Sequence, residues 1–207
     1  MLAYLIIIIV LLYSIILHEL AHAKVAEIMG DPTARLAGRI TLNPIPHLDP
    51  IGTLLPILLM LGGAPIVFGW AKPVPINPYN FHDQRRGLIY VSAAGIVINL
   101  LIAWVLATVL KFLPAADSTG MMLLAEALQF GVRINIVLAV FNLLPIPPLD
   151  GSKLFEMILP YPYSEYIYRM EPYGFLILIF ILIFPPTEAL LWWLINSIYN
   201  LLMVRLF

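Results

Sequence analysis

The stretch that decides the fold is residues 2–28, which read LAYLIIIIVLLYSIILHELAHAKVAEI. Residues 2–17 are almost entirely apolar, and about 20 such residues in a helix are enough to cross the hydrocarbon core of a bilayer. Residues 1–17 contain no basic residue, whereas a cleaved signal peptide has a basic region before its apolar core. The stretch therefore predicts a permanent membrane-spanning helix that carries ionisable residues from His18 onward.

The composition of the whole chain points the same way. Apolar residues make up 62% of the 207 residues and charged residues only 11%. Soluble domains carry about 25% charged residues, so this chain has too few charges to cover a water-facing surface. The net charge of −1 supplies no basic field for phosphates, which excludes nucleic acid as a partner. The absence of cysteine excludes disulfides and thiolate zinc sites.

Five further apolar segments predict an all-α polytopic membrane protein with about five to six hydrophobic segments. The last two flank Pro185-Pro186, which is typical of a helical hairpin, and the first contains several prolines and glycines. Breaks of this kind at membrane depth occur where the backbone lines a protein cavity. The five segments are residues 51–69, 88–113, 130–146, 167–184 and 187–206.

Basic residues in the loops give the expected topology. Loops 30–50 and 70–87 both carry arginines, and by the positive-inside rule both lie on the cytoplasmic side. The two loops share a side only if segment 51–69, which joins them, enters and leaves the membrane on that side. Segment 51–69 is either a kinked full span or a re-entrant loop, and the basic loops on both sides of it favour the re-entrant loop.

Residues 18–22 read HELAH and match the pattern H-E-x-x-H. Positions i and i+4 of a helix face the same way, so the rings of His18 and His22 can bind one zinc ion. Glu19 then lies beside the open coordination position, where a carboxylate can take a proton from water and pass it to a leaving amine. The alternative is a polar stripe held by hydrogen bonds alone. Ionisable groups within a span are costly and usually functional, which favours the zinc site.

A catalytic zinc site needs a third protein ligand. Asp150 stands out because residues 142–151, NLLPIPPLDG, end an apolar span with prolines and then present one carboxylate. The alternative is a solvated aspartate at a proline-capped helix end. The candidates for the third ligand are Glu27, His47, Asp49, His82 and Asp150.

The motifs at residues 18–22 and 142–151 together resemble the site-2 protease family of intramembrane zinc metalloproteases. The resemblance covers roughly residues 10–153 and is to the small prokaryotic branch, which lacks PDZ and CBS domains. Further stretches that look like this branch are residues 30–34, 42–53 and 69–75.

The resemblance implies a role for each matching residue. His18, His22 and Asp150 would bind one zinc ion per chain, and Glu19 would be the catalytic base. The family associates the asparagine before its Leu-Asp-Gly motif, here Asn142, with the active-site region. For this chain the resemblance implies one membrane-embedded peptidase domain over residues 1–207, with the catalytic core at about 1–153 and a helical hairpin at about 154–207.

Other polar residues are candidates for supporting roles. Ser92, Gly95, Asn99 and Ala103 fall at i, i+3, i+7 and i+11 and form one small, polar stripe, which we expect to pack against the histidine face of the first span. Asn99 can hydrogen-bond a zinc ligand or the substrate, or act as interhelical glue.

Asn142 can donate to an oxyanion or cap the broken backbone. His47, in a proline-flanked loop, is either ordinary polar surface or a gate or accessory zinc ligand. The arginines of the loops, Arg35, Arg39, Arg85 and Arg86, are interpreted as membrane-flanking charge.

We therefore expect a multi-pass protein of a prokaryotic cytoplasmic membrane that cleaves peptide bonds in or near transmembrane segments of membrane proteins, with lipid as its other partner. The alternatives are a metal or proton transporter and an inactive membrane scaffold that use the same polar site. A transporter of this kind predicts an internal repeat and several ligand sites along a path, and the sequence contains one such site and no repeat. A scaffold predicts the loss of Glu19 or of a ligand.

Overall fold

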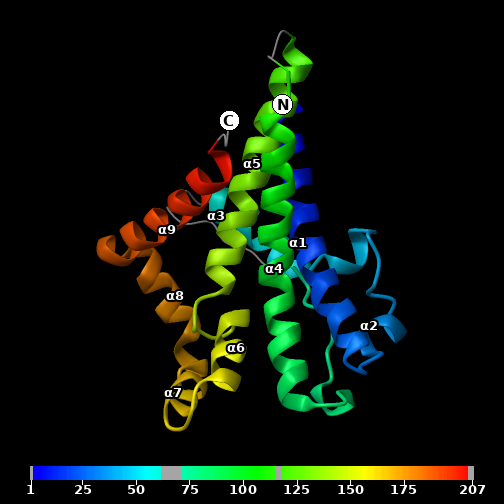
Figure 1. Cartoon of the computed structure of the whole chain (residues 1–207), viewed down its shortest axis with the longest axis vertical. Coiled ribbons are helices and arrows are strands. Elements are labelled where there is room, and N and C mark those ends of the chain that lie inside the picture. Colours follow the sequence, from blue (N-terminus) through cyan, green and yellow to red (C-terminus); the bar gives the residue numbers. More distant parts are fainter. Residues whose placement is uncertain (1, 62–70, 115–117, 205–207) are drawn as a thin grey trace.

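A computed structural model describes residues 2–61, 71–114 and 118–204, and within them every regular element is a helix. Three long helices run side by side along the long axis of the molecule (Figure 1): α1 (Leu2–Ile28), α4 (Gln84–Lys111) and α5 (Thr119–Asn142). Each is long and apolar enough to cross a membrane. The expected all-α membrane protein is thereby confirmed.

The remaining elements are shorter and lie around this three-helix core. Helices α8 and α9 splay away from α5 on one side, and α6 and α7 lie at one end of the molecule (Figure 1). They are α2 (Thr33–Leu36), η1 (Ile45–His47), α3 (Pro50–Leu61), η2 (Pro78–Asn80), α6 (Asp150–Ile158), α7 (Tyr163–Arg169), η3 (Glu171–Tyr173), α8 (Gly174–Ile183) and α9 (Pro185–Met203).

The boundaries of several predicted segments need correction. Residues 130–142 of segment 130–146 are the second half of α5, which begins at Thr119, where the Ser118 side chain caps the backbone N–H of Met121. Among the described residues, three helices qualify as spans, or four if α7, η3 and α8 form one span bent by 43°. The five to six predicted hydrophobic segments also include apolar helices such as α3 and α9, which are not among these spans.

The helix bundle buries polar side chains between its helices and exposes apolar side chains on its outer face, as lipid requires. On α1 the buried residues include Ser14, His18 and His22, whereas Leu5 and Ile8 on its outer face are more than half exposed. Ser14 accepts a hydrogen bond of 2.9 Å from the buried amide of Asn135 on α5. Because lipid tails are as apolar as leucine, packing and hydrogen bonds of this kind hold the helices together.

The small stripe on α4 packs inward as predicted. Ser92, Gly95, Asn99 and Ala103 are all buried. Small residues let helix backbones approach closely in a membrane, and here they bring α4 against both α1 and α5. This close approach sets the depth at which the polar residues of α1 meet those of α4.

The described residues that flank segment 51–69 on either side, His47 and Lys72, lie next to each other. The backbone N–H of Lys72 donates to the carbonyl oxygen of His47 at 2.9 Å, so the chain leaves and returns at one depth. This is the arrangement that a re-entrant segment requires. Helix α3 accounts for residues 50–61 of the segment, and residues 62–70 lie outside the described part of the chain.

The C-terminal part forms the expected hairpin. Helix α9 begins at Pro185, where the backbone turns away from α8, and its first turn is pinned by the Thr187 hydroxyl donating to the carbonyl of Ile181 at 2.8 Å. Leu191 and Ile195 of α9 pack into the apolar cluster formed by α4 and α5. The hairpin therefore packs against α4 and α5 of the three-helix core and not against the polar residues of α1.

Candidate metal centre

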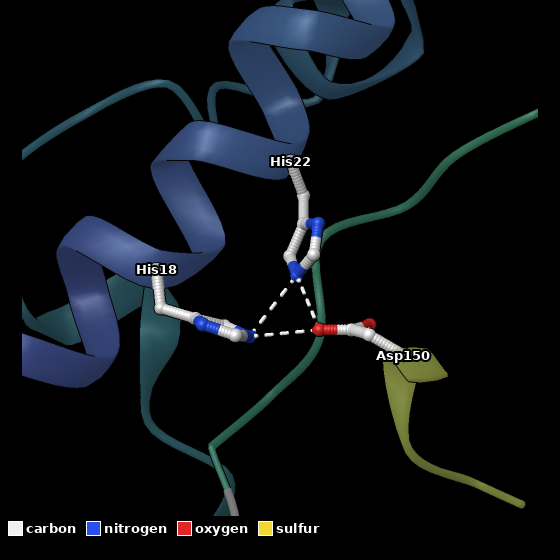
Figure 2. A group of neighbouring side chains, drawn as sticks. All are labelled: His18, His22 and Asp150. Atoms are coloured by element: carbon white, nitrogen blue, oxygen red, sulfur yellow. Dashed lines mark hydrogen bonds and ion pairs between the residues drawn. The ribbon is translucent and has the colours of Figure 1, made fainter. Parts of the chain in front are cut away.

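His18, His22 and Asp150 converge on one point (Figure 2). The two Nε2 atoms lie 3.0 Å apart, and Oδ2 of Asp150 lies 3.1 Å from Nε2 of His18 and 3.0 Å from Nε2 of His22. Both histidines are buried. The three ligand atoms come from α1 and from the first residue of α6, which are 128 residues apart in sequence.

The tautomer of His22 follows from its second nitrogen. Nδ1 lies 2.7 Å from the carbonyl oxygen of Val91 on α4, and a carbonyl can only accept. Nδ1 therefore carries the proton, and in the neutral ring Nε2 presents a lone pair toward Asp150 and His18. A carbonyl behind a histidine in this way is the usual support for a metal ligand.

The three atoms fit a zinc ion. Three ligands about 2.0–2.1 Å from one tetrahedral ion lie about 3.3 Å from one another, close to the distances found here. Lone pairs that converge with no proton between them repel one another unless a cation lies among them. Two imidazoles and one carboxylate match the ligand types that zinc prefers and leave a fourth position open.

Gly95 makes the space for both imidazoles. A Cβ atom at this position would overlap Cε1 of His18 and Nε2 of His22. Glycine is therefore needed here because the α4 backbone itself forms the floor under the two rings. This explains why the stripe on α4 includes a glycine at the level of the metal ligands.

Asp150 reaches the histidines from the start of a helix. The backbone before it is broken at Pro145, Pro147 and Pro148, and α6 begins at Asp150 itself, where a carboxylate is favoured by the helix dipole. At Gly151 a Cβ atom would overlap the carbonyl oxygens of Leu143 and Leu144, so the next residue must also be glycine.

Glu19 lies in the same cavity as the three ligands. The cavity has a volume of about 690 Å³, and Glu19, Asn142 and Lys153 are among the residues that line it. Oε2 of Glu19 accepts a hydrogen bond of 2.8 Å from the backbone N–H of Val74. A carboxylate held beside three ligands and open to a cavity can exchange protons with a bound water molecule.

The other candidates for the third ligand are engaged elsewhere. Glu27 forms ion pairs with Lys24 and Arg35, and Asp49 accepts a hydrogen bond from the backbone N–H at the start of α3. His47 is buried, and its Nε2 lies 2.9 Å from the carbonyl oxygen of Thr41. Neither His47 nor His82 joins the group of ligand atoms found among the described residues.

The two candidate asparagines lie in different places. Asn142 lines the cavity, and one of its two amide protons bonds the carbonyl of Leu138 at 3.0 Å. Asn99 is fully buried, is not among the cavity residues, and has no hydrogen-bond partner for either amide atom within the described part of the chain. It lies one helical turn beyond Gly95 on the same face of α4.

Three groups that contact the site or the cavity wall were not predicted from the sequence. The carbonyl of Val91 and the N–H of Val74 are backbone groups, so no residue type marks them. Arg39 was interpreted as flanking charge, but its side chain is buried and donates to the carbonyls of Lys72 and Pro73. Neither its residue type nor its position in a polar loop distinguished it from the exposed arginines.

Comparisons with known proteins agree with this chemistry. The model of "Peptidase family M50" matches residues 113–184, which include Asp150. "Putative zinc metalloprotease YwhC" of Bacillus subtilis is 40% identical over 197 residues, which cover 92% of this chain and 85% of the relative. "Putative zinc metalloprotease Rip2" of Mycobacterium tuberculosis is 32% identical over 192 residues, which cover 91% and 69%. No solved structure matches the chain significantly.

The space at Gly95 is testable by metal analysis. Gly95→Ala should reduce zinc affinity by about tenfold or more, because the added methyl group displaces both imidazoles. Gly120→Ala is the matched control, since a Cβ there meets nothing within 4 Å. A His18→Ala/His22→Ala double variant supplies the zinc-free reference. Full zinc content in Gly95→Ala after dialysis against a weak chelator would contradict the assignment.

Proposed function

The chain belongs to peptidase family M50, the site-2 protease family, and from this premise we propose that it cleaves peptide bonds within or near the transmembrane segments of other membrane proteins. The observation that carries the proposal is the convergence of His18, His22 and Asp150 at the wall of a cavity between membrane-spanning helices. A zinc ion held by these residues would polarise a peptide carbonyl and acidify a water molecule.

Depth supports an intramembrane site. His18 lies about 24 Å along α1 from Leu2, at a rise of about 1.5 Å per residue. The hydrocarbon core is about 30 Å thick, so the ligands lie within it and toward its second face. A scissile bond must come to this depth, which suits a substrate that is itself embedded in the membrane.

Glu19 is assigned as the general base. Its carboxylate opens on the cavity that the metal ligands share, and the N–H of Val74 holds one of its oxygens. The other oxygen is then free to take a proton from the attacking water and return it to the leaving amine. The lone pairs of His18, His22 and Asp150 would be bound to the metal ion, so these three side chains are not available to transfer the proton.

A transporter is the second candidate, and the polar residues of the described chain do not favour it. Transport needs a series of ligand sites along a path. Among the described residues, one group of three side chains can hold a metal. All residues that peptide hydrolysis requires are present, which also argues against an inactive scaffold.

Glu19→Gln should retain zinc and lose cleavage. General acid–base catalysis contributes about 10²–10⁴-fold, so turnover of a single-span substrate should fall by that factor while the zinc content stays near one equivalent. Glu126→Gln, an exposed position on α5, is the matched control. The parent protein with a zinc chelator gives the background rate. Near-normal turnover by Glu19→Gln would refute the assigned role.

Substitutions of Asn142 and Asn99 should have different effects when turnover and zinc content are measured as for Glu19→Gln. We assign Asn142, which faces the cavity, to the substrate carbonyl, and Asn99, which does not, to the outer side of the metal ligands. Asn99 lies one turn beyond Gly95, the residue against which the His18 ring packs, and within the described chain both its amide atoms and Nδ1 of His18 are buried without a hydrogen-bond partner. Asn142→Ala should lower turnover about 10²-fold with zinc retained, and Asn99→Leu should lower zinc affinity about 10-fold. The reverse pattern would exchange the two roles.

Substrates should have to unwind before they are cut. A helix hides its carbonyls in i→i−4 hydrogen bonds, so the scissile segment must be extended in the cavity. The irregular segment 71–77 at the cavity wall offers a backbone for strand-like pairing.

Replacing Gly, Pro or Asn near the cut site of a cleaved substrate by Leu should therefore slow cleavage, because these residues lower the cost of unwinding. Membrane insertion of each substrate variant is measured in parallel as the control. Equal cleavage rates across several such pairs would show that unwinding does not limit the reaction.

A further inference from the structure

Part of the cavity wall is formed by residues 71–77, which have no regular backbone hydrogen bonding of their own. Residues 71–77 form no regular element, and Ala71, Pro73 and Val74 are among the residues that line the cavity. Pro73 and Pro75 have no backbone N–H, so a regular ladder of hydrogen bonds is not available to this segment. Its position must therefore come from groups elsewhere in the chain.

Three of its backbone N–H groups are bound by distant parts of the chain. The N–H of Lys72 donates to the carbonyl of His47 at 2.9 Å, and the N–H of Val74 to Oε2 of Glu19 at 2.8 Å. At the far end, the N–H of Asn77 donates to Oδ2 of Asp31 at 2.7 Å. The middle contact is the one that reaches the general base.

The far end of the segment is held firmly. Asp31 is fully buried and also accepts hydrogen bonds from Thr33 and from the Asn80 side chain. Burial acts to raise the pKa of Asp31, but the hydrogen bonds from Thr33, Asn77 and Asn80 outweigh it and hold that pKa below its ordinary value. Asp31 thus stays ionised as a fixed acceptor at residue 77.

Arg39 holds the carbonyls at the near end. Its Nη2 donates to the carbonyl of Lys72 at 2.6 Å and its Nη1 to that of Pro73 at 3.2 Å. The side chain is 6% exposed, and no carboxylate pairs with it among the described residues. A buried charge without hydrogen bonds is costly, and the planar fork of a guanidinium suits two adjacent acceptors. The contacts of Arg39 are thus concentrated on the residues just before Val74.

We propose that Arg39 is a positioning residue for Glu19, acting through the backbone of residues 72–74. By holding the carbonyls of Lys72 and Pro73, it presents the N–H of Val74 to the Glu19 carboxylate and keeps the other carboxylate oxygen directed at the water. The inference rests on the proposed function for its catalytic consequence, whereas the position of the segment can be measured without any substrate.

The position of the segment is tested by thiol labelling, since the chain contains no cysteine. Val74 is buried against Ala23 and Ala34, so a Val74→Cys side chain should react slowly with a maleimide. Adding Arg39→Gln should raise the labelling rate at least tenfold. Arg35→Gln is the matched control, because Arg35 lies on the adjacent helix α2 and its side chain is 64% exposed. That variant should leave the labelling rate unchanged.

The catalytic consequence is tested in the cysteine-free background. Arg39→Gln should lower kcat about 100-fold, as expected when a catalytic group is misplaced by about an ångström. Zinc content should stay near one equivalent, since Arg39 contacts none of the ligands. KM should change much less than kcat. Arg39→Lys keeps the charge but not the fork, so it should give intermediate values of kcat and of labelling.

Each outcome bears on the proposal. Unchanged labelling in Arg39→Gln would show that Arg39 does not hold the segment, and faster labelling with normal kcat would show that the segment does not position Glu19. If Arg39→Gln fails to fold, Arg39→Lys is the test variant. A labelling rate and a kcat equal to those of the parent protein in Arg39→Lys would then overturn the inference. A parent protein that cleaves no peptide would instead refute the proposed function, and the labelling result would still decide whether Arg39 holds the segment.

Discussion

The structure depends on the convergence of three lone pairs, on Nε2 of His18, Nε2 of His22 and Oδ2 of Asp150, about 3 Å from one another. Such an arrangement is repulsive unless the three atoms share a cation. The helix α1, the glycine floor on α4 and the broken backbone before α6 all serve to keep these atoms together. The Nδ1–H of His22 is committed to the carbonyl of Val91, which leaves its other nitrogen for the metal.

The three-helix core differs from a soluble protein on its outer surface. Large apolar side chains such as Leu5, Ile8 and Trp104 face outward, whereas the inner faces combine small and polar residues with an apolar cluster. Because lipid gives helices no hydrophobic reason to associate, close approach and hydrogen bonds must hold them. The pair formed by Ser14 and Asn135 is one such bond, and Gly95 is the point of closest approach at the metal ligands.

Irregular backbone beside the site is stabilised by side chains in place of water. Residues 71–77 form no regular element, and buried backbone carbonyl and N–H groups without partners are costly. Arg39, Asp31 and Glu19 supply those partners. The same contacts that satisfy the backbone therefore also connect the wall of the cavity to Glu19, the proposed general base.

The sequence by itself determined the membrane class, because this follows from composition. It also determined the pair of histidines at i and i+4, the adjacent Glu19 and the inward-facing stripe from Ser92 to Ala103, because these follow from the 3.6-residue period of a helix. Among five candidates for the third ligand it singled out Asp150, and it indicated membrane-flanking charge for Arg39. Only the tertiary structure brings Asp150, which follows His22 by 128 residues, to the two histidines and folds residues 39 and 72 together. Such pairings depend on how helices pack, and the backbone partners of His22 and Glu19 carry no side-chain identity, so no local pattern could reveal them.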